Sequence, residues 1–291
     1  METTDASRAL FPRTTVAGVS LSRMLIGTNW IFGWSHTGAA ADSLILKRNH
    51  SPEAVADLLE VFLRAGVDTL MGPLSKQPIG IAGIALAEER TGKKLIIVDT
   101  PILNMENSTA GRHEAEAKIA ECKTNGATFC LLHHSSAEQL VNKNKGTMDR
   151  LPDYLKMIRD HGMIPGLSAH MPELIIYSDQ QGYDVETYIQ IFNCLGFLMQ
   201  VEIEYIHKVI WNAKKPVMTI KPMAAGRCTP FVGLNFVWNT IRPQDMVTVG
   251  CLAPEEAAED IEISLAALER RMPALAGRNS PNKKTAVLSE K

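Results

Sequence analysis

The sequence predicts an α/β fold, a (β/α)8 TIM barrel, and three observations support that prediction. Short apolar runs alternate with longer segments whose apolar residues recur at helical spacing. The chain has 291 residues, which suits one barrel of about 250 residues with short ends. Several runs stop at an ionisable residue, as expected for barrel strands, whose carboxyl ends carry the reactive groups of barrel enzymes. A two-layer doubly wound sheet is the alternative that the same alternation allows.

Seven strands can be placed from uninterrupted apolar runs, because parallel strands are covered on both faces. The expected strands are Met24–Thr28, Val67–Met71, Leu95–Val98, Thr128–Leu132, Met163–Ser168, Val217–Ile220 and Met246–Gly250.

Helices are expected between these strands. The segment from Ser51 to Gly66 is the clearest, since Ser51 can cap it, Pro52 suits its first turn and Gly66 can end it. The same helical spacing predicts helices over Arg112–Thr124, Met148–Asp160 and Pro254–Arg271.

The missing sixth strand has two candidates, Val185–Asn193 and Phe197–Ile203. The second shows strand-like alternation, but its apolar residues also continue a helical stripe. The first is preferred because it leaves a helix from about Leu198 to Ala213 to return the chain to the next parallel strand.

One barrel domain is expected over residues 16–273, with Val16–Ser22 as a small hairpin or cap before the first strand. Residues 1–15 and 274–291 are polar, and we expect both to be flexible segments.

The composition favours a soluble, cytoplasmic protein of enzyme size. The chain is 45% hydrophobic and 21% charged, with a formal net charge of −2, so it offers no general attraction for nucleic acid. No apolar run approaches the roughly 18 residues of a membrane span. The five cysteines are odd in number and widely spaced, which argues against a disulfide framework or a Cys-x-x-Cys metal site. A small-molecule substrate is the expected partner, and a homo-oligomer is left open.

Three histidines follow predicted strands. His133 ends the run that begins at Ala127, His170 ends the run from Met163, and His36 lies in the loop after the first strand. If these strand ends meet at one rim, the three imidazoles could bind Zn²⁺, Mn²⁺ or Fe²⁺ with an open position for substrate. Otherwise each is a hydrogen-bonded structural residue. His134 should point away from this rim, because alternate side chains of a strand face opposite sides.

Other side chains are predicted to join the same rim. Asp99, after the third strand, is a candidate fourth ligand or base, and Lys221, after the seventh, could stabilise an oxyanion or act as a base. Asp68 is either a catalytic carboxylate or a hydrogen-bond acceptor. The candidate substrate contacts are Ser168, Trp34 and Arg227; Arg227 could bind an anionic or polyol group, or pair with a surface carboxylate.

From about Val16 to Arg271 the chain resembles the aldo-keto reductase superfamily. The matching pieces are Val19–Thr28, Ala65-Gly-Val-Asp-Thr69, Leu131-Leu-His133, Gly166–Glu173, Lys221–Gly226 and Val249–Glu255, which are specific in their order and spacing together. The resemblance implies a (β/α)8 barrel with Asp68 and His133 at two positions of the reductase catalytic tetrad.

The chain departs from the reductase pattern at its other functional positions. Pro73 stands in place of the proton-donating Tyr, and Pro101 in place of the Lys. Ala169 replaces the Asn of a nicotinamide-binding Ser-Asn pair, and Glu259-Asp260 stands where the last helix usually has an Asn. Proline can neither donate a proton nor tune one, so NAD(P)H is a less expected cofactor than a divalent metal. Two further pieces, Gly33–His36 and Lys221–Arg227, resemble a smaller branch of the barrel family that we associate with no firm activity.

These residues lead to one expected function and two alternatives. The expected function is a metal-assisted acid–base enzyme, a lyase, isomerase or hydrolase, acting on a small hydroxycarbonyl or sugar-like substrate. The alternatives are a divergent NAD(P)H-dependent oxidoreductase with an altered proton relay, and a non-catalytic ligand-binding barrel.

Overall fold

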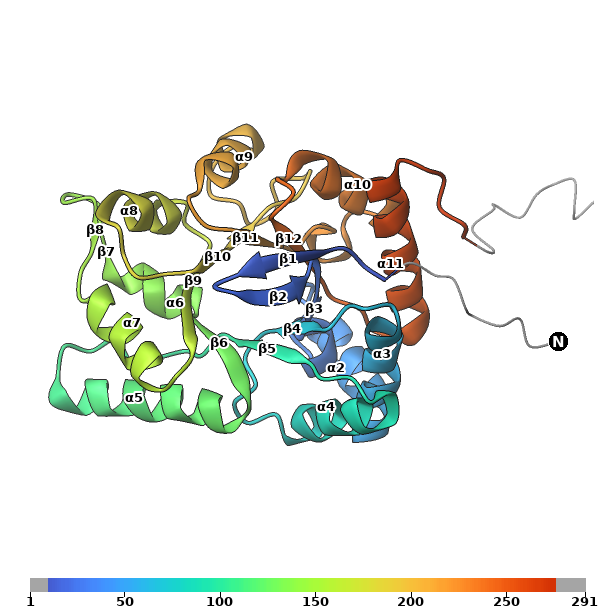
Figure 1. Ribbon diagram of the computed structural model, residues 1–291, viewed down its shortest axis with the longest axis horizontal. Coiled ribbons are helices and arrows are strands. Elements are labelled where there is room, and N and C mark those ends of the chain that lie inside the picture. Colours follow the sequence, from blue (N-terminus) through green and yellow to red (C-terminus); the bar gives the residue numbers. More distant parts are fainter. Residues whose placement is uncertain (1–9, 276–291) are drawn as a thin grey trace, which may run out of the picture.

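The computed structural model describes residues 10–275 and shows a closed barrel of eight parallel strands (Figure 1). Neighbouring strands follow the order of the chain, and the last pairs with the first. The preferred candidate for the sixth strand is confirmed, since β10 lies within Val185–Asn193. The barrel strands are β3 Met24–Gly27, β4 Thr69–Met71, β5 Ile96–Asp99, β6 Ala127–Leu132, β9 Ile164–Ala169, β10 Thr187–Ile191, β11 Val217–Ile220 and β12 Met246–Val249.

Helices surround the barrel (Figure 1). The predicted first long helix is α3, where the Ser51 side chain accepts a hydrogen bond from the Ala54 N–H and Gly66 takes a left-handed conformation after the end. The longer helices are α2 Ala39–Arg48, α3 Pro52–Arg64, α4 Pro78–Thr91, α5 Thr109–Thr124, α7 Leu151–Asp160, α8 Glu173–Gln181, α9 Ile203–Asn212, α10 Pro230–Thr240 and α11 Pro254–Glu269; α1 Asn29–Phe32 and α6 His134–Ala137 are single turns.

Helix α9 begins later than the sequence predicts, at Ile203 instead of about Leu198. The buried Asn193 holds the preceding segment in a loop, because its Oδ1 accepts from the N–H groups of Leu195 and Phe197 and its Nδ2 donates to the Phe197 carbonyl. This side chain competes with helix formation in the way that Asn residues commonly do.

A hairpin of β1 Arg13–Val16 and β2 Val19–Ser22 covers the amino-terminal end of the barrel (Figure 1). It begins before the predicted domain boundary at residue 16, so residues 13–15 are an ordered strand rather than a flexible segment. Residues 1–9 and 276–291, most of the two segments expected to be flexible, lie outside the described residues. A second hairpin joins β7 Val141–Asn142 to β8 Thr147–Met148.

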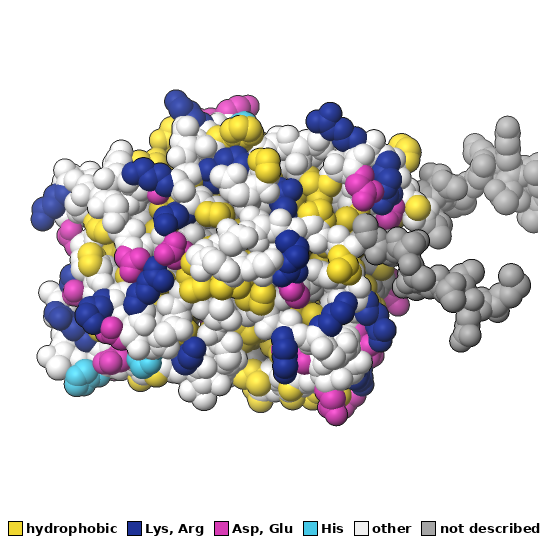
Figure 2. All heavy atoms as spheres, in the orientation of Figure 1, with side chains coloured by type: hydrophobic (Ala, Val, Ile, Leu, Met, Phe, Trp, Pro, Cys, Tyr) yellow, Lys and Arg dark blue, Asp and Glu magenta, His cyan; other side chains and the backbone are white. Residues whose placement is uncertain are grey.

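Figure 2 shows that Lys and Arg side chains on the hairpin face are interspersed with Asp and Glu and do not gather into one basic patch. Within residues 10–275, no helix has the length and hydropathy that crossing a membrane requires.

The barrel interior is filled by alternate side chains of the strands. Phe129 and Leu131 of β6 face inward, so His133 follows on the same side at the carboxyl end. In β9 a Cβ on Gly166 would lie 2.7 Å from Leu131 Cγ, which also places Gly166 on the inner face, followed by Ser168 and His170 at the same period. The apolar interior below thus supports a polar layer above it.

Candidate active site

A pocket of about 920 Å³ opens at the carboxyl ends of the barrel strands. This is the end at which barrel enzymes carry their reactive residues. Its lining contains seven of the nine predicted site residues, Trp34, His36, His133, Ser168, His170, Lys221 and Arg227, but neither Asp68 nor Asp99.

Lys221 follows β11 directly, and its side chain lines the pocket. No hydrogen bond or ion pair to its Nζ is found among the described residues, and burial lowers its pKa to about 8. Its backbone has φ +60°, a left-handed conformation that costs a non-glycine residue free energy. Such strain is concentrated at functional sites.

His133 and His170 are both held neutral near this amine. Burial, with smaller contributions from His134 and Lys221, lowers the pKa of His133 to about 4. Burial, followed by the charge of Lys221, lowers the pKa of His170 to about 2. The Nδ1 of His133 accepts from the Ser135 N–H at 3.3 Å, which leaves Nε2 to carry the proton of the neutral ring. His133 can therefore donate a hydrogen bond, while the unprotonated ring of His170 can accept one.

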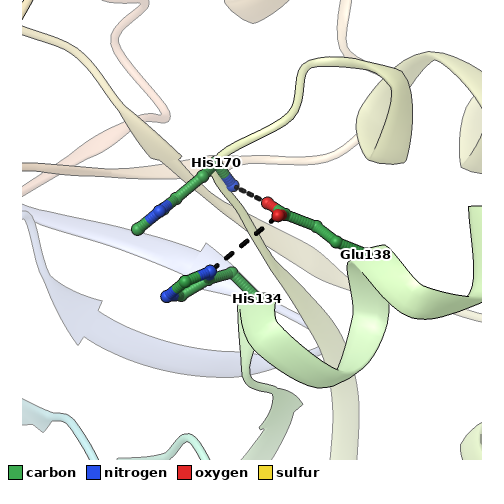
Figure 3. A group of neighbouring side chains, drawn as sticks. All are labelled: His134, Glu138 and His170. Carbon is green, nitrogen blue, oxygen red and sulfur yellow. Dashed lines mark hydrogen bonds and ion pairs between the residues drawn. The ribbon is translucent and has the colours of Figure 1, made fainter. Parts of the chain in front are cut away.

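Glu138 fixes the position of His170 (Figure 3). Its Oε1 accepts from the backbone N–H groups of His170 and Met171 at 2.9 and 3.0 Å, and its Oε2 lies 3.9 Å from His134 Nδ1. Although burial opposes it, hydrogen bonds from His134 and these two N–H groups hold the pKa of Glu138 below its usual value. The carboxylate thus ties α6 to the end of β9.

The interpretation of His134 as a residue pointing away from the rim was wrong. Strand alternation ends at Leu132, and the turn of helix α6 brings His134 over His170, with ring centroids 3.6 Å apart and planes 15° apart. His134 and Glu138 were not predicted as site residues. Their spacing of four, which puts two side chains on one helical face, was the available signal.

The structure groups a different set of potential metal ligands from the predicted His36, His133 and His170. All three predicted residues line the pocket, but among the described residues the atoms within 4.8 Å of one another belong to His134, Glu138 and His170. An imidazole binds a metal in its ring plane at about 2.0–2.1 Å. Because the rings of His134 and His170 are nearly parallel and stacked, at least one must rotate before both can bind one ion.

Arg227, Trp34 and His36 line the outer part of the pocket. The Arg227 guanidinium stacks on the Phe197 ring at 4.0 Å and donates to the Ala224 carbonyl, and no ion pair with a carboxylate is found for it among residues 10–275. It is therefore available to an anionic or polar group of a ligand. His36 Nε2 lies 3.1 Å from Asn29 Nδ2, at the rim.

The structure contradicts the prediction of Asp99 as a site residue. Asp99 is the last residue of β5 and its side chain faces outward, since its neighbour Val98 belongs to the barrel interior. The carboxyl accepts from the Leu74 N–H at 3.3 Å and lies against the Cys122 thiol of α5. Burial raises the pKa of Asp99 to about 6.

This buried carboxyl should make the protein less stable as the pH rises. The pKa of an ordinary aspartate is 3.8, and that of Asp99 in the folded protein is about 6. The folded state therefore binds the proton more tightly than the unfolded state, and stability is lost as the pH rises from about 4 to about 6. The difference corresponds to at most about 3 kcal/mol. Thermal unfolding of Asp99→Asn across this range should show a weaker pH dependence than the native protein, whereas Asp160→Asn, at an exposed position, should not. Equal slopes for native protein and Asp99→Asn would contradict the assignment.

Asp68 is also placed away from the pocket. It precedes β4 at the opposite, amino-terminal end of the barrel, where it accepts from the Ser22 N–H and pairs with Arg13 of the hairpin at 2.8 Å. The position that the reductase resemblance gave it was therefore wrong. The four tetrad positions correspond to Asp68, Pro73, Pro101 and His133. Pro73 and Pro101 line the pocket but cannot titrate, so of these four residues only His133 places a titratable side chain there.

Comparisons with known proteins show similarity of fold. No protein-family model matches the sequence, and no curated protein matches it. A Pseudomonas aeruginosa protein assigned provisionally to the aldo-keto reductases has a TM-score of 0.66 and 14% identity, covering 91% of this chain and 100% of that chain. Aldose reductase from Giardia lamblia has a TM-score of 0.51 and 13% identity, covering 91% of this chain and 90% of that chain. The protein thus has the (β/α)8 fold of the aldo-keto reductases, and similarity at this low identity concerns the fold alone.

Proposed function

We propose that the protein is a lyase or isomerase that binds a small hydroxycarbonyl or sugar-like compound through a Schiff base on Lys221. The observation that carries the proposal is the placement of Lys221: an amine with no counter-ion among residues 10–275, in the pocket at the strand ends, beside two uncharged imidazoles. Lysines in such surroundings react with carbonyl compounds because a larger fraction of the amine is unprotonated at neutral pH.

The chemistry needs only groups that the pocket contains. The neutral Lys221 amine attacks the substrate carbonyl carbon, and His133 donates a hydrogen bond to the oxygen as its negative charge develops. Loss of water from the resulting carbinolamine gives an iminium ion. This ion withdraws electrons from the adjacent carbon, so a proton is lost more readily there to water in the pocket, for isomerisation, or from a hydroxyl one carbon further, for carbon–carbon cleavage. Hydrolysis of the imine returns the free amine.

Arg227 supports the choice of substrate class. Lys221 and Arg227 flank one loop, and both line the pocket. An anionic or polar group on the far end of the substrate could bind the Arg227 guanidinium while the substrate carbonyl reaches the Lys221 amine.

Trapping with a reducing agent tests the proposal. Incubation with glyceraldehyde and cyanoborohydride should place a reduced adduct on Lys221, located by peptide mass spectrometry. Lys221→Met, which removes the amine and keeps the length of the side chain, should lose this adduct. Lys208→Gln, at an exposed lysine of α9, should keep it. Label that is spread over surface lysines and missing from Lys221 would reject the proposal.

A divalent metal enzyme is the second candidate, and the grouping of His134, Glu138 and His170 favours it. A bound ion could polarise a carbonyl or acidify a water molecule there. If it binds, protein purified without chelator should hold close to one equivalent of Zn²⁺, Mn²⁺ or Fe²⁺ by elemental analysis, and His134→Ala should hold at least about tenfold less. His113→Ala, at an exposed histidine of α5, is the matched control. Less than a tenth of an equivalent, with no uptake on adding Zn²⁺ or Mn²⁺, would remove this candidate.

A further inference from the structure

Cys194 and Cys228 bring two thiols together at the mouth of the pocket. Their Sγ atoms lie 3.5 Å apart although the residues are 34 positions apart in the chain. Cys194 lies in the loop between β10 and α9, and Cys228 in the loop between β11 and α10, where it lines the pocket. Both residues are partly exposed, so a small oxidant in solvent can reach them.

The other cysteines do not offer the same chemistry. Cys122 and Cys130 also lie within hydrogen-bond distance of each other, but both are buried between the barrel and α5. Cys251 is buried against Asp260. Among the described residues, accessible paired thiols are therefore found at Cys194 and Cys228.

We propose that Cys194 and Cys228 are a redox modification site that forms a reversible disulfide between the loops after β10 and β11, beside the pocket. A disulfide has its sulfur atoms about 2.05 Å apart, so the two thiols need to approach by only about 1.5 Å. Neither residue belongs to a helix or strand, so the movement need not distort either kind of element. The contact of Arg227 with Phe197 already joins the same two loops at 4.0 Å.

The order of the reaction follows from the two environments. Burial and the hydrogen bond with Cys194 raise the pKa of the Cys228 thiol to about 11, so the first reaction is assigned to Cys194. Its thiolate attacks hydrogen peroxide, taking one oxygen atom to form a sulfenic acid and releasing water. The Cys228 sulfur then attacks the sulfenic sulfur, and the hydroxyl group leaves as a second water. The two thiols together lose two electrons and two protons, and the peroxide is reduced to two waters.

The disulfide would restrain the loop that carries Lys221 and Arg227. In the reduced protein the non-covalent contact of Arg227 with Phe197 joins this loop to its neighbour, and the Asn193 side chain holds the loop around Cys194 through hydrogen bonds from the N–H groups of Leu195 and Phe197. A covalent link to that fixed point limits the motion of residues 221–229. The link itself does not depend on the proposed Schiff base, since no step of it uses Lys221.

Hydrogen peroxide treatment of the full-length native protein tests the proposal. The intact mass should fall by two hydrogens, and a non-reducing digest should contain one peptide pair that joins Cys194 to Cys228. Of the five thiols counted in the denatured protein before oxidation, three should remain. Dithiothreitol should restore all five. Cys194→Ser and Cys228→Ser should each abolish the link, and Cys122→Ser, at a buried cysteine, should retain it.

Hydrogen exchange of the same samples checks the structural consequence. Amides within residues 221–229 should exchange more slowly in the oxidised protein, and those of α5, on the far side of the barrel, should be unchanged. Oxidation that adds oxygen atoms to either cysteine without joining them would overturn the proposal. So would a link that survives in Cys194→Ser or Cys228→Ser.

Discussion

Lys221 should form trapped adducts at pH 7 about 200-fold faster than an exposed lysine. With a pKa of about 8, roughly a tenth of its amine is unprotonated at pH 7, whereas an exposed lysine with a pKa of about 10.4 is unprotonated to only about 0.04%. The rate at Lys221 should be half-maximal near pH 8 and level off near pH 9, while the rate at surface lysines should continue to rise toward pH 10. Peptide mass spectrometry after timed exposure to glyceraldehyde and cyanoborohydride, from pH 6 to 9.5, measures both curves.

Two controls separate chemistry from folding. Lys208 in the same sample supplies the exposed-lysine curve. Lys221→Met should leave only that slow background. It should unfold at a temperature no lower than the native protein, because it removes a buried charge for which residues 10–275 offer no ion-pair partner. If Lys221 and Lys208 follow one pH curve, the pocket does not activate the amine and the Schiff-base proposal fails.

The barrel could be predicted because its signal is local. A strand covered on both faces must be apolar along its whole length, and runs such as the one from Ala127 to Leu132 meet that condition. The inward direction of His133 follows from the same strand, since it continues the alternation of Phe129 and Leu131. The position of His133 in the pocket could therefore be predicted from the sequence.

The predictions for Asp68 and Asp99 were wrong because the strand register placed Asp68 at the other end of the barrel and turned the Asp99 side chain outward. Asp68 was expected at a strand end, but β4 has only three residues and begins after it, which leaves the side chain at the opposite end of the barrel. Asp99 does lie at a strand end, one residue out of phase with the inner face. A shift of one residue reverses the side on which a strand residue lies, and an apolar run does not fix this phase when both faces are buried.

His134 and Glu138 were missed because each lies in a single helical turn, His134 in α6 and Glu138 in the 3-10 turn Glu138–Leu140 that follows it. Helix α6 spans four residues, too few to show a helical repeat in the sequence. Its position over β9 is a tertiary contact, made through the hydrogen bonds of Glu138 to the backbone beyond that strand. Local pattern could not reveal such a contact, although it decides which imidazole faces His170.

Arg242→Ala should destabilise the fold by about 3–5 kcal/mol, the largest effect on stability that we expect from one side chain. Arg242 and Asp245 form a buried ion pair, with Nη2 to Oδ1 at 2.7 Å and Nε to Oδ2 at 2.8 Å. Arg242 also donates to the carbonyls of Ala213 and Lys215, and Asp245 accepts from the Val217 N–H. The pair thus joins the segments that enter β11 and β12, and removing the guanidinium leaves a buried carboxylate and carbonyls without their donor.

Thermal and urea unfolding should show this loss as a fall in Tm of roughly 6–20 °C. Arg159→Ala is the matched control, because Arg159 pairs with Asp184 and Glu186 near solvent and should lose no more than about 1 kcal/mol. Adding Asp245→Asn to Arg242→Ala should recover part of the loss, since it removes the uncompensated charge. The pair lies at the entry to the strands, away from the pocket, so the folded Arg242→Ala protein should still form the Lys221 adduct. Equal stabilities of the Arg242 and Arg159 variants would show that the buried pair does not hold these strand entries together.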